Sequence, residues 1–210
     1  MKKIILFLTT ALFSILQLNA QKIFSEGIIK YDVFINNHIN PEGTYIITFK
    51  SGFIKRALTM KNGFNNVTIY NQKTSKTISF NPDDEYKYAL EYTEDELKEK
   101  NKRFQNPVFT GNGLSKKIVG YTCEGSMVLY ENKDEVQVYT TSELIPQNEH
   151  FNNQFPGLKG MPLEYETISS PSNKMKFVAN LIEVKVIDSK VFSIPANYKI
   201  ITKKELSQSK

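Results

Sequence analysis

Apolar and polar residues alternate with a period of two along most of this chain. The alternation is clearest in residues 45–50, 121–129 and 163–167, where large apolar side chains occupy every second position. Such a pattern is typical of antiparallel strands with one buried face. About nine runs of this kind follow one another at short spacing, which favours a meander-like sheet or a barrel over βαβ units.

Residues between and within these runs predict how the strands turn and bend. Lys61-Asn62-Gly63 predicts a tight hairpin, because Asn and Gly tolerate the positive φ of a primed turn. Within Lys174–Ile187 the apolar side changes phase near Leu181–Ile182. Either a β-bulge or burial of opposite faces at the two ends of the strand explains this change. Both explanations suit a strongly curved sheet.

One helix is predicted after Thr93, where Thr93 and Glu96 form a capping box. Acidic residues come first and basic residues last, as the helix dipole favours. Leu97 is the only apolar residue within Glu94–Lys102, so we expect a surface helix. The following segment, 101–116, contains Pro107 and several glycines and predicts a long irregular connection.

The first twenty residues have the pattern of a secretory signal peptide. Lys2 and Lys3 precede an apolar run over 4–18, and Leu18-Asn19-Ala20 ends in a small residue. The run is short and interrupted for a membrane span. We therefore expect 1–20 to be removed and 21–210 to form one domain, exported to the periplasm or associated with the outer membrane, without a transmembrane segment. A retained N-terminal anchor is the alternative.

Charge and cysteine usage exclude several classes of partner. The formal net charge of +5 would fall to +3 on loss of Lys2 and Lys3, and the remaining lysines are interspersed with acids. This indicates a solvated surface and no nucleic-acid partner. Of 27 lysines and arginines only two are arginine, a bias typical of AT-rich bacterial genomes. The single cysteine, Cys123, excludes an internal disulfide.

The sequence contains no constellation that predicts catalysis. Cys123 and His150 are a conceivable nucleophile and base, but Cys123 lies on the apolar side of a strand, where cysteine behaves as a small hydrophobe. Asp83-Asp84-Glu85 follows Pro82 and predicts a turn, with a weak calcium contact as the alternative. We expect a protein that is not an enzyme and has no metal site and no cofactor.

The stretch FPGLKGMPLEYE, 155–166, combines loop residues with large apolar side chains. The chain is rich in such side chains, with 11 Tyr and 14 Phe. Two interpretations of the loop remain open: its apolar residues close one end of an ordinary core, or they gate a cavity for an apolar ligand.

Four short motifs occur in order along the second half of the chain. They are Gly-Tyr-x-Cys (120–123), Tyr-Thr (139–140), Lys-Gly-x-Pro-Leu-x-x-Glu (159–166) and Phe-x-x-Pro-x-x-Tyr (192–198). In these motifs the chain resembles an uncharacterised family of exported Bacteroidota proteins, whose fold is similar to that of the periplasmic lipoprotein carriers (LolA-like). The resemblance implies a mainly β fold with minor α structure: a curved antiparallel sheet or half-barrel, with one or a few helices covering an apolar hollow. It implies no catalytic residues.

Two functions are compatible with these residues and with the resemblance. The first is a cell-envelope protein that binds a lipid, an acyl chain or a lipidated partner such as a lipoprotein in the hollow. The second is an interaction or sensor domain with a filled core that pairs with an envelope protein and binds no small ligand. For the first, strand phase and the loop predict an apolar site formed by Phe109, Met127, Phe155, Leu158, Met161, Leu163 and Phe177.

Overall fold

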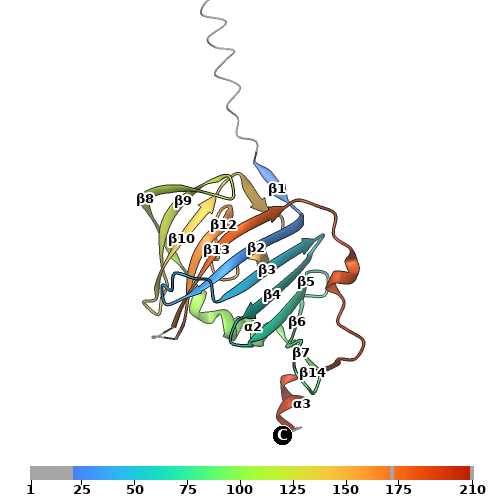
Figure 1. Cartoon of the computed structure of the whole chain (residues 1–210). Helices are drawn as coiled ribbons and strands as arrows, with labels where there is room; N and C mark the ends of the chain where they lie inside the picture. Colours follow the sequence, from blue (N-terminus) through green and yellow to red (C-terminus); the bar gives the residue numbers. More distant parts are fainter. Residues whose placement is uncertain (1–20, 171–172, 209–210) are drawn as a thin grey trace, which may run out of the picture.

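The computed structural model describes residues 21–170 and 173–208. The predicted signal peptide, 1–20, lies outside the described residues and stays a prediction. Twelve strands form one large, curved, open sheet in the order β14-β7-β6-β5-β4-β3-β2-β13-β12-β10-β9-β8 (Figure 1). The predicted fold class, mainly β with a curved antiparallel sheet and few helices, is confirmed.

The described elements have the following bounds. The strands are β1 (Lys22–Phe24), β2 (Glu26–Ile35), β3 (Gly43–Lys50), β4 (Phe53–Met60), β5 (Asn65–Asn71), β6 (Lys76–Phe80), β7 (Tyr88–Tyr92), β8 (Val108–Ile118), β9 (Tyr121–Leu129), β10 (Glu135–Thr141), β11 (Leu144–Pro146), β12 (Met161–Ser170), β13 (Asn173–Glu183) and β14 (Lys199–Thr202). The helices are α2 (Glu94–Asn101) and α3 (Lys203–Gln208), with short 3-10 turns η2 (Lys102–Phe104), η3 (Glu149–Asn152) and η4 (Ser189–Phe192).

Pairing within the large sheet is antiparallel except at one edge, where β14 runs parallel to β7. The pair of β2 with β13, near the middle of the sheet, joins an early segment of the chain to a late one. β1 and β11 form a separate parallel pair. The sheet is therefore assembled from segments far apart in the sequence.

The concave face of the sheet holds the larger core. Side chains from β2, β3, β9, β10, β12 and β13 meet there in one buried cluster, which includes Ile29, Tyr31, Val128 and Leu163. Strands that are distant within the sheet contribute to the same cluster, so this face is the inner one. Phe155, from the segment before β12, is buried in it as well.

The convex face of β4–β7 is covered by the C-terminal segment that follows β13, which Figure 1 shows leaving the sheet and returning to it at β14. Phe192 packs on Phe53 with ring centroids 5.3 Å apart, and Tyr198 packs on Phe80 at 4.8 Å. The Phe-x-x-Pro-x-x-Tyr motif thus has a structural role, since its two aromatic residues attach this segment to the sheet.

Local predictions for the hairpin and the helix are confirmed. Gly63 has φ +87° in the turn between β4 and β5, and its amide donates to the Met60 carbonyl at 3.1 Å. Thr93 and Glu96 form the capping box of α2. No residue of α2 is buried, as expected for a surface helix.

The prediction of an irregular connection over 101–116 is wrong, because most of it belongs to η2 and the edge strand β8. Among the described strands β8 pairs only with β9, and its register shifts between Gly111 and Ser115. Most of its residues are exposed. An edge strand that is exposed on both faces needs no alternation of polarity, so the pattern that identifies strands is absent there.

The phase change in β13 is a bulge. Its pairing with β2 shifts register between Ala179 and Leu181, after which Ile182 pairs with Ile29 and packs against the concave core. The strand ends at Glu183, and Val186 beyond it is 85% exposed. One extra residue therefore returns the apolar side chains to the inner face.

Candidate functional site

Most of the apolar residues predicted for a binding site lie together on the concave side. Phe155, Met161, Leu163 and Phe177 belong to the buried core cluster. Phe109 and Leu158 are partly buried and pack against it. Met127 is partly buried but lies outside the cluster, on the β9 face opposite to Val128. The structure thus brings six of the seven residues to one region, where they fill space.

Aromatic rings occupy the part of the hollow under β12 and β13. Tyr165 stacks on Phe177 with centroids 4.8 Å apart and meets Phe155 edge-on at 5.6 Å. The Tyr31 hydroxyl donates to the Pro162 carbonyl at 2.9 Å. Burial raises the pKa of both tyrosines well above the usual range, so their hydroxyls stay protonated. This part of the hollow is a packed core.

Residues 147–160, which we call the closing segment, cover the concave face between β11 and β12. Phe151 packs on Phe49 at 4.9 Å, and the carbonyl of Gln154 accepts from the Tyr130 hydroxyl at 2.6 Å. The Arg56 guanidinium of β4 donates to the carbonyl of His150 at 2.7 Å. One backbone bond, from the Gln147 amide to the Phe24 carbonyl at 3.2 Å, attaches the start of the segment, and side chains attach the rest, whereas ladder bonds join the strands.

Glycines allow the path of the closing segment. Gly157 has φ +83° and Gly160 has φ +93°, values that L side chains rarely adopt. At Gly160 a Cβ atom would also lie 2.3 Å from the Thr141 carbonyl oxygen. The chain therefore passes close to β10 before Met161 begins β12.

A cavity of about 270 Å³ lies between the closing segment, α2 with η2, and the sheet. Tyr45, Ile47, Phe155 and Tyr165 are among the apolar and aromatic residues that line it. Leu97 of α2, the single apolar residue of that helix, lines it from the other side. The capped surface helix thus places its one hydrophobic side chain over the hollow.

The positive side chains of this cavity come from three elements: Arg56 (β4), Lys100 (α2) and Arg103 (η2). Burial raises the pKa of Tyr45, and the Arg56 charge and its hydrogen bond to Tyr45 oppose that rise. Sequence patterns did not identify these three residues as a group. The one signal was the rarity of arginine, since both arginines of the chain line this cavity.

Two amide side chains in the closing segment carry buried oxygens without a partner among the described residues. They are Asn152 Oδ1 and Gln154 Oε1, and both residues line the cavity. The Asn152 amide nitrogen donates to the Gly160 carbonyl at 3.2 Å. Both oxygens are buried in the wall of the cavity and are not exposed to it.

A second cavity, of about 540 Å³, adjoins the first and shares Leu97 and Asn152 with it. Its lining is more polar and includes His150, which stacks on Tyr70 with centroids 4.3 Å apart. Together the two cavities form a depression between α2 and the closing segment. Ligand pockets in proteins commonly have volumes of about 300–1,000 Å³.

A cavity of about 500 Å³ beside η2 is lined by Lys100 and Arg103 together with the carboxylates of Glu99 and Glu131.

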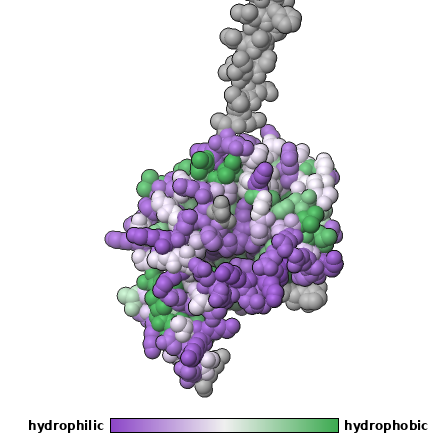
Figure 2. All heavy atoms as spheres, turned by 180° about the vertical axis from the view of Figure 1, so that it is seen from behind, coloured by the Kyte–Doolittle hydropathy of each residue, from purple (hydrophilic) through white to green (hydrophobic). Residues whose placement is uncertain are grey.

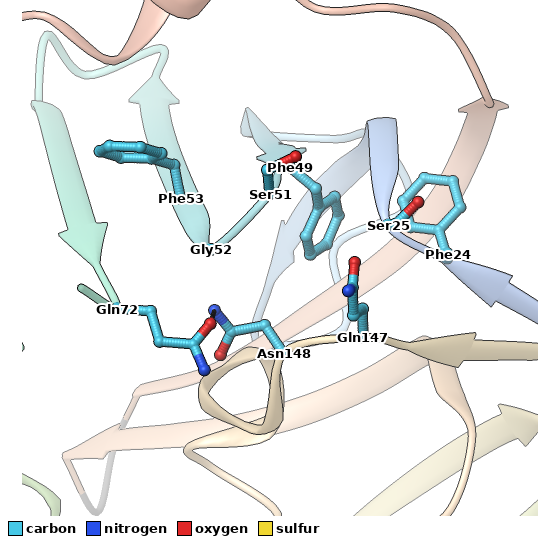
Figure 3. A pocket seen from close by; sticks show the side chains of 9 residues that line it. All are labelled: Phe24, Ser25, Phe49, Ser51, Gly52, Phe53, Gln72, Gln147 and Asn148. Carbon is cyan, nitrogen blue, oxygen red and sulfur yellow. Dashed lines mark hydrogen bonds between the residues drawn. The ribbon is translucent and has the colours of Figure 1, made fainter.

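Two further cavities lie outside the depression between α2 and the closing segment. One of about 340 Å³ lies at the β3–β4 turn and has an uncharged lining, in which the Asn148 amide donates to Gln72 Oε1 at 3.3 Å (Figure 3). The buried rings of Phe24 and Phe49 form its wall (Figure 3). The other, of about 660 Å³, lies against the closing segment and includes Leu158.

The residues that the sequence suggested for catalysis and for metal binding belong to different elements of the structure. Cys123 is buried, and burial together with Glu143 raises its thiol pKa to about 11. Asp83 lies in the turn after β6, where its amide donates to Asn81 at 2.9 Å. Within residues 21–170 and 173–208, no three His, Cys, Asp or Glu side chains gather as metal ligands would. In the same residues no helix has the length and apolar character needed to span a membrane.

No protein-family model and no curated protein matches the chain. Among solved structures it resembles PNGF-II in two crystal forms, with 15% and 14% identity and TM-scores of 0.51 and 0.52. These matches cover 87% and 88% of this chain but 32% and 33% of PNGF-II, so the chain spans about a third of that protein's length.

An uncharacterized conserved protein from Thermus thermophilus also matches, with 5% identity and a TM-score of 0.51 over 93% of this chain and 99% of that one. At such identities the likeness concerns the fold alone. A LolA superfamily protein from Nitrosomonas europaea matches more weakly, with a TM-score of 0.34 and 7% identity over 82% of this chain and 92% of that one. That score is too low to support an inference, so the Bacteroidota family and its motifs stay predictions, while the curved, open sheet is a finding.

Proposed function

We propose that the protein is a non-enzymatic binding protein of the cell envelope that holds the apolar part of an amphipathic ligand between the closing segment, α2 and the concave face. The cavity of about 270 Å³ carries this proposal, because it lies over the apolar core and is closed by one segment and one lightly attached helix. Burial of ligand methylenes there would supply about 0.8 kcal/mol each.

The way the cavity is closed supports ligand entry. Within the closing segment, turn bonds such as Leu158 N to Phe155 O at 3.0 Å replace a ladder. The segment ends at two glycines with positive φ, which absorb changes of backbone angle easily. Segments with few ladder bonds open at low free energy compared with sheet strands. Displacement of Phe151 and Phe155 would enlarge the cavity toward the aromatic core.

One observation favours the alternative, an interaction domain with a filled core. Phe155 is only 2% exposed, and Met161 and Leu163 are fully buried, so most of the predicted apolar site is occupied by the protein itself. On the face seen in Figure 2, however, hydrophobic residues form small separate patches on a mostly hydrophilic surface. Large protein interfaces are commonly marked by contiguous apolar patches.

Native mass spectrometry of the protein, purified without detergent from the cells that make it, tests the proposal. A bound mass that solvent extraction identifies as a fatty acid or phospholipid is the expected result. A chain that carries no added mass and also fails to bind fluorescent fatty acids would exclude ligand binding and leave the interaction domain.

A further inference from the structure

The positive charges at the first cavity are unusual for this chain. Nearly all of its basic residues are lysines, yet both arginines, Arg56 and Arg103, line this one cavity together with Lys100. No described carboxylate lines it. A cleft lined by charges of one sign concentrates the potential that attracts an oppositely charged ligand.

No described carboxylate forms an ion pair with these cations, although Glu99 and Glu131 line a neighbouring cavity with Lys100 and Arg103. Lys98 and Lys102, the neighbours of Lys100, each pair with a carboxylate of α2. The ion pairs of the described residues include none made by Lys100, Arg56 or Arg103. Like charges around one small cavity repel each other, and an anion between them would relieve that repulsion, although solvent screens the exposed Lys100 and Arg103.

Both guanidinium groups also have N–H donors that their contacts within the protein do not use. Arg56 uses Nη2 toward the carbonyls of His150 and Phe151, at 2.7 and 3.5 Å, and also hydrogen-bonds to Tyr45. Arg103 uses Nη1 toward the carbonyl of Ile168 at 2.9 Å and lies 4.5 Å from the Phe104 ring centroid. A guanidinium has five N–H donors, more than these contacts use, and its planar fork matches a carboxylate or phosphate.

We propose that this cavity receives the oxyanion headgroup of an amphipathic ligand, a carboxylate or a phosphate. Arg56 would meet it from the sheet, and Lys100 and Arg103 from the covering helices, while the acyl chain lies against Leu97 and Phe155. The inference rests on the proposed function and names the ligand class for the same site. It also explains why arginine occurs here in a chain that otherwise uses lysine.

Isothermal titration calorimetry on protein purified from cells expressing the full chain tests this inference. Palmitate is compared with hexadecanol, which has the same chain length without the charge. Monoacyl phosphatidic acid, acetate and inorganic phosphate are titrated in parallel. The main variant is Arg103→Gln, since Arg103 is exposed and its replacement opens no core. The matched control is Lys102→Gln, which removes the adjacent charge but does not alter the cavity lining.

We expect palmitate or the monoacyl phosphate to bind at least about tenfold more tightly than hexadecanol, and the tighter of the two identifies the headgroup. Arg103→Gln should weaken binding of that amphiphile about tenfold without changing hexadecanol binding. Lys102→Gln should leave both unchanged. Arg56→Lys, which keeps the charge and loses the planar fork, should also weaken the charged amphiphile selectively.

The other outcomes separate the two proposals. Equal binding of palmitate and hexadecanol, with no response to Arg103→Gln, would overturn the headgroup inference and leave the proposed function intact. If acetate or phosphate bound as tightly as the amphiphiles, the cavity would be a site for free oxyanions. That result would overturn the proposal that an acyl chain contributes to binding. Absence of binding by every amphiphile would overturn the proposed function and the headgroup inference with it.

Discussion

The guanidinium of Arg56 donates to the carbonyl oxygen of His150 across 2.7 Å, and a side chain of β4 thereby holds the segment that closes the concave face. The two residues are 94 positions apart in the sequence. The same guanidinium lines the cavity beneath that segment. Closure and the charge of the cavity are consequently linked through one residue.

Arg56→Met should loosen the closing segment. Loss of this charge-assisted bond, partly exposed to solvent, should cost about 1 kcal/mol and increase amide hydrogen exchange within 147–160. Lys55→Met is the matched control, because Lys55 donates to the Val191 carbonyl at 3.1 Å on the opposite face. Its effect should be confined to the C-terminal segment. Equal exchange in 147–160 for wild type and Arg56→Met would contradict a holding role.

Gly160→Ala should destabilise the fold more than Gly157→Ala. Both glycines have positive φ, but only at Gly160 would the new Cβ approach a carbonyl oxygen, that of Thr141, at 2.3 Å. At Gly157 it would meet nothing within 4 Å. We expect a loss of about 1 kcal/mol at Gly157 and about 2 kcal/mol or more at Gly160. Urea denaturation of both variants measures the difference, and equal losses would refute the steric explanation.

Tyr31→Phe should destabilise the concave core by about 1–3 kcal/mol, because it leaves the buried Pro162 carbonyl without its donor. Tyr198→Phe provides the comparison. The Tyr198 hydroxyl donates to the Asn81 carbonyl at 3.0 Å in a partly buried place, where water can replace it. Thermal unfolding should show the larger loss for Tyr31→Phe. A larger loss for Tyr198→Phe would mean that the hydrogen bond of the C-terminal segment contributes more to stability than the buried bond from Tyr31 to Pro162.

The attachment of the C-terminal segment should weaken in acid. The Ile187 amide donates to Glu26 at 2.7 Å and Lys50 lies 3.1 Å from it, which together lower the pKa of Glu26 below its usual value of 4.5. A carboxyl whose pKa is lower in the folded protein than in the unfolded chain stabilises the fold fully when the pH is above its pKa in the unfolded chain. That contribution is lost as the pH falls through its pKa in the folded protein. Thermal melts between pH 7 and pH 3 should therefore show a smaller decrease for Glu26→Gln than for wild type. Parallel curves for the two proteins would exclude this contribution.

Local features were predictable because they depend on neighbours in the sequence. The Lys61-Asn62-Gly63 turn and the Thr93 cap each need only a few adjacent residues, and both formed as expected. The edge strand β8 was missed, because exposure of both its faces removes the alternation that marks a strand. Met127 was assigned to the inner face by phase, and the strand places Val128 there instead.

The make-up of the candidate site depends on tertiary structure more than the turns and caps do. Arg56, Lys100 and Arg103 belong to three elements, and residue spacing does not indicate that these elements meet at one cavity. The rarity of arginine was visible, but rarity does not state where the residues meet. The aromatic loop was visible too, and only packing shows that Phe155 fills the hollow while a cavity remains beside it.

By itself, the sequence determined the mainly β class, the hairpin and the capped surface helix, because alternation, turn residues and caps act over a few positions. Tertiary structure decided which face of each strand is concave, where the closing segment lies and which charges meet over the hollow. The physical reason is that pairing between β2 and β13 and burial of rings such as Phe155 and Tyr165 bring together residues that the chain keeps far apart.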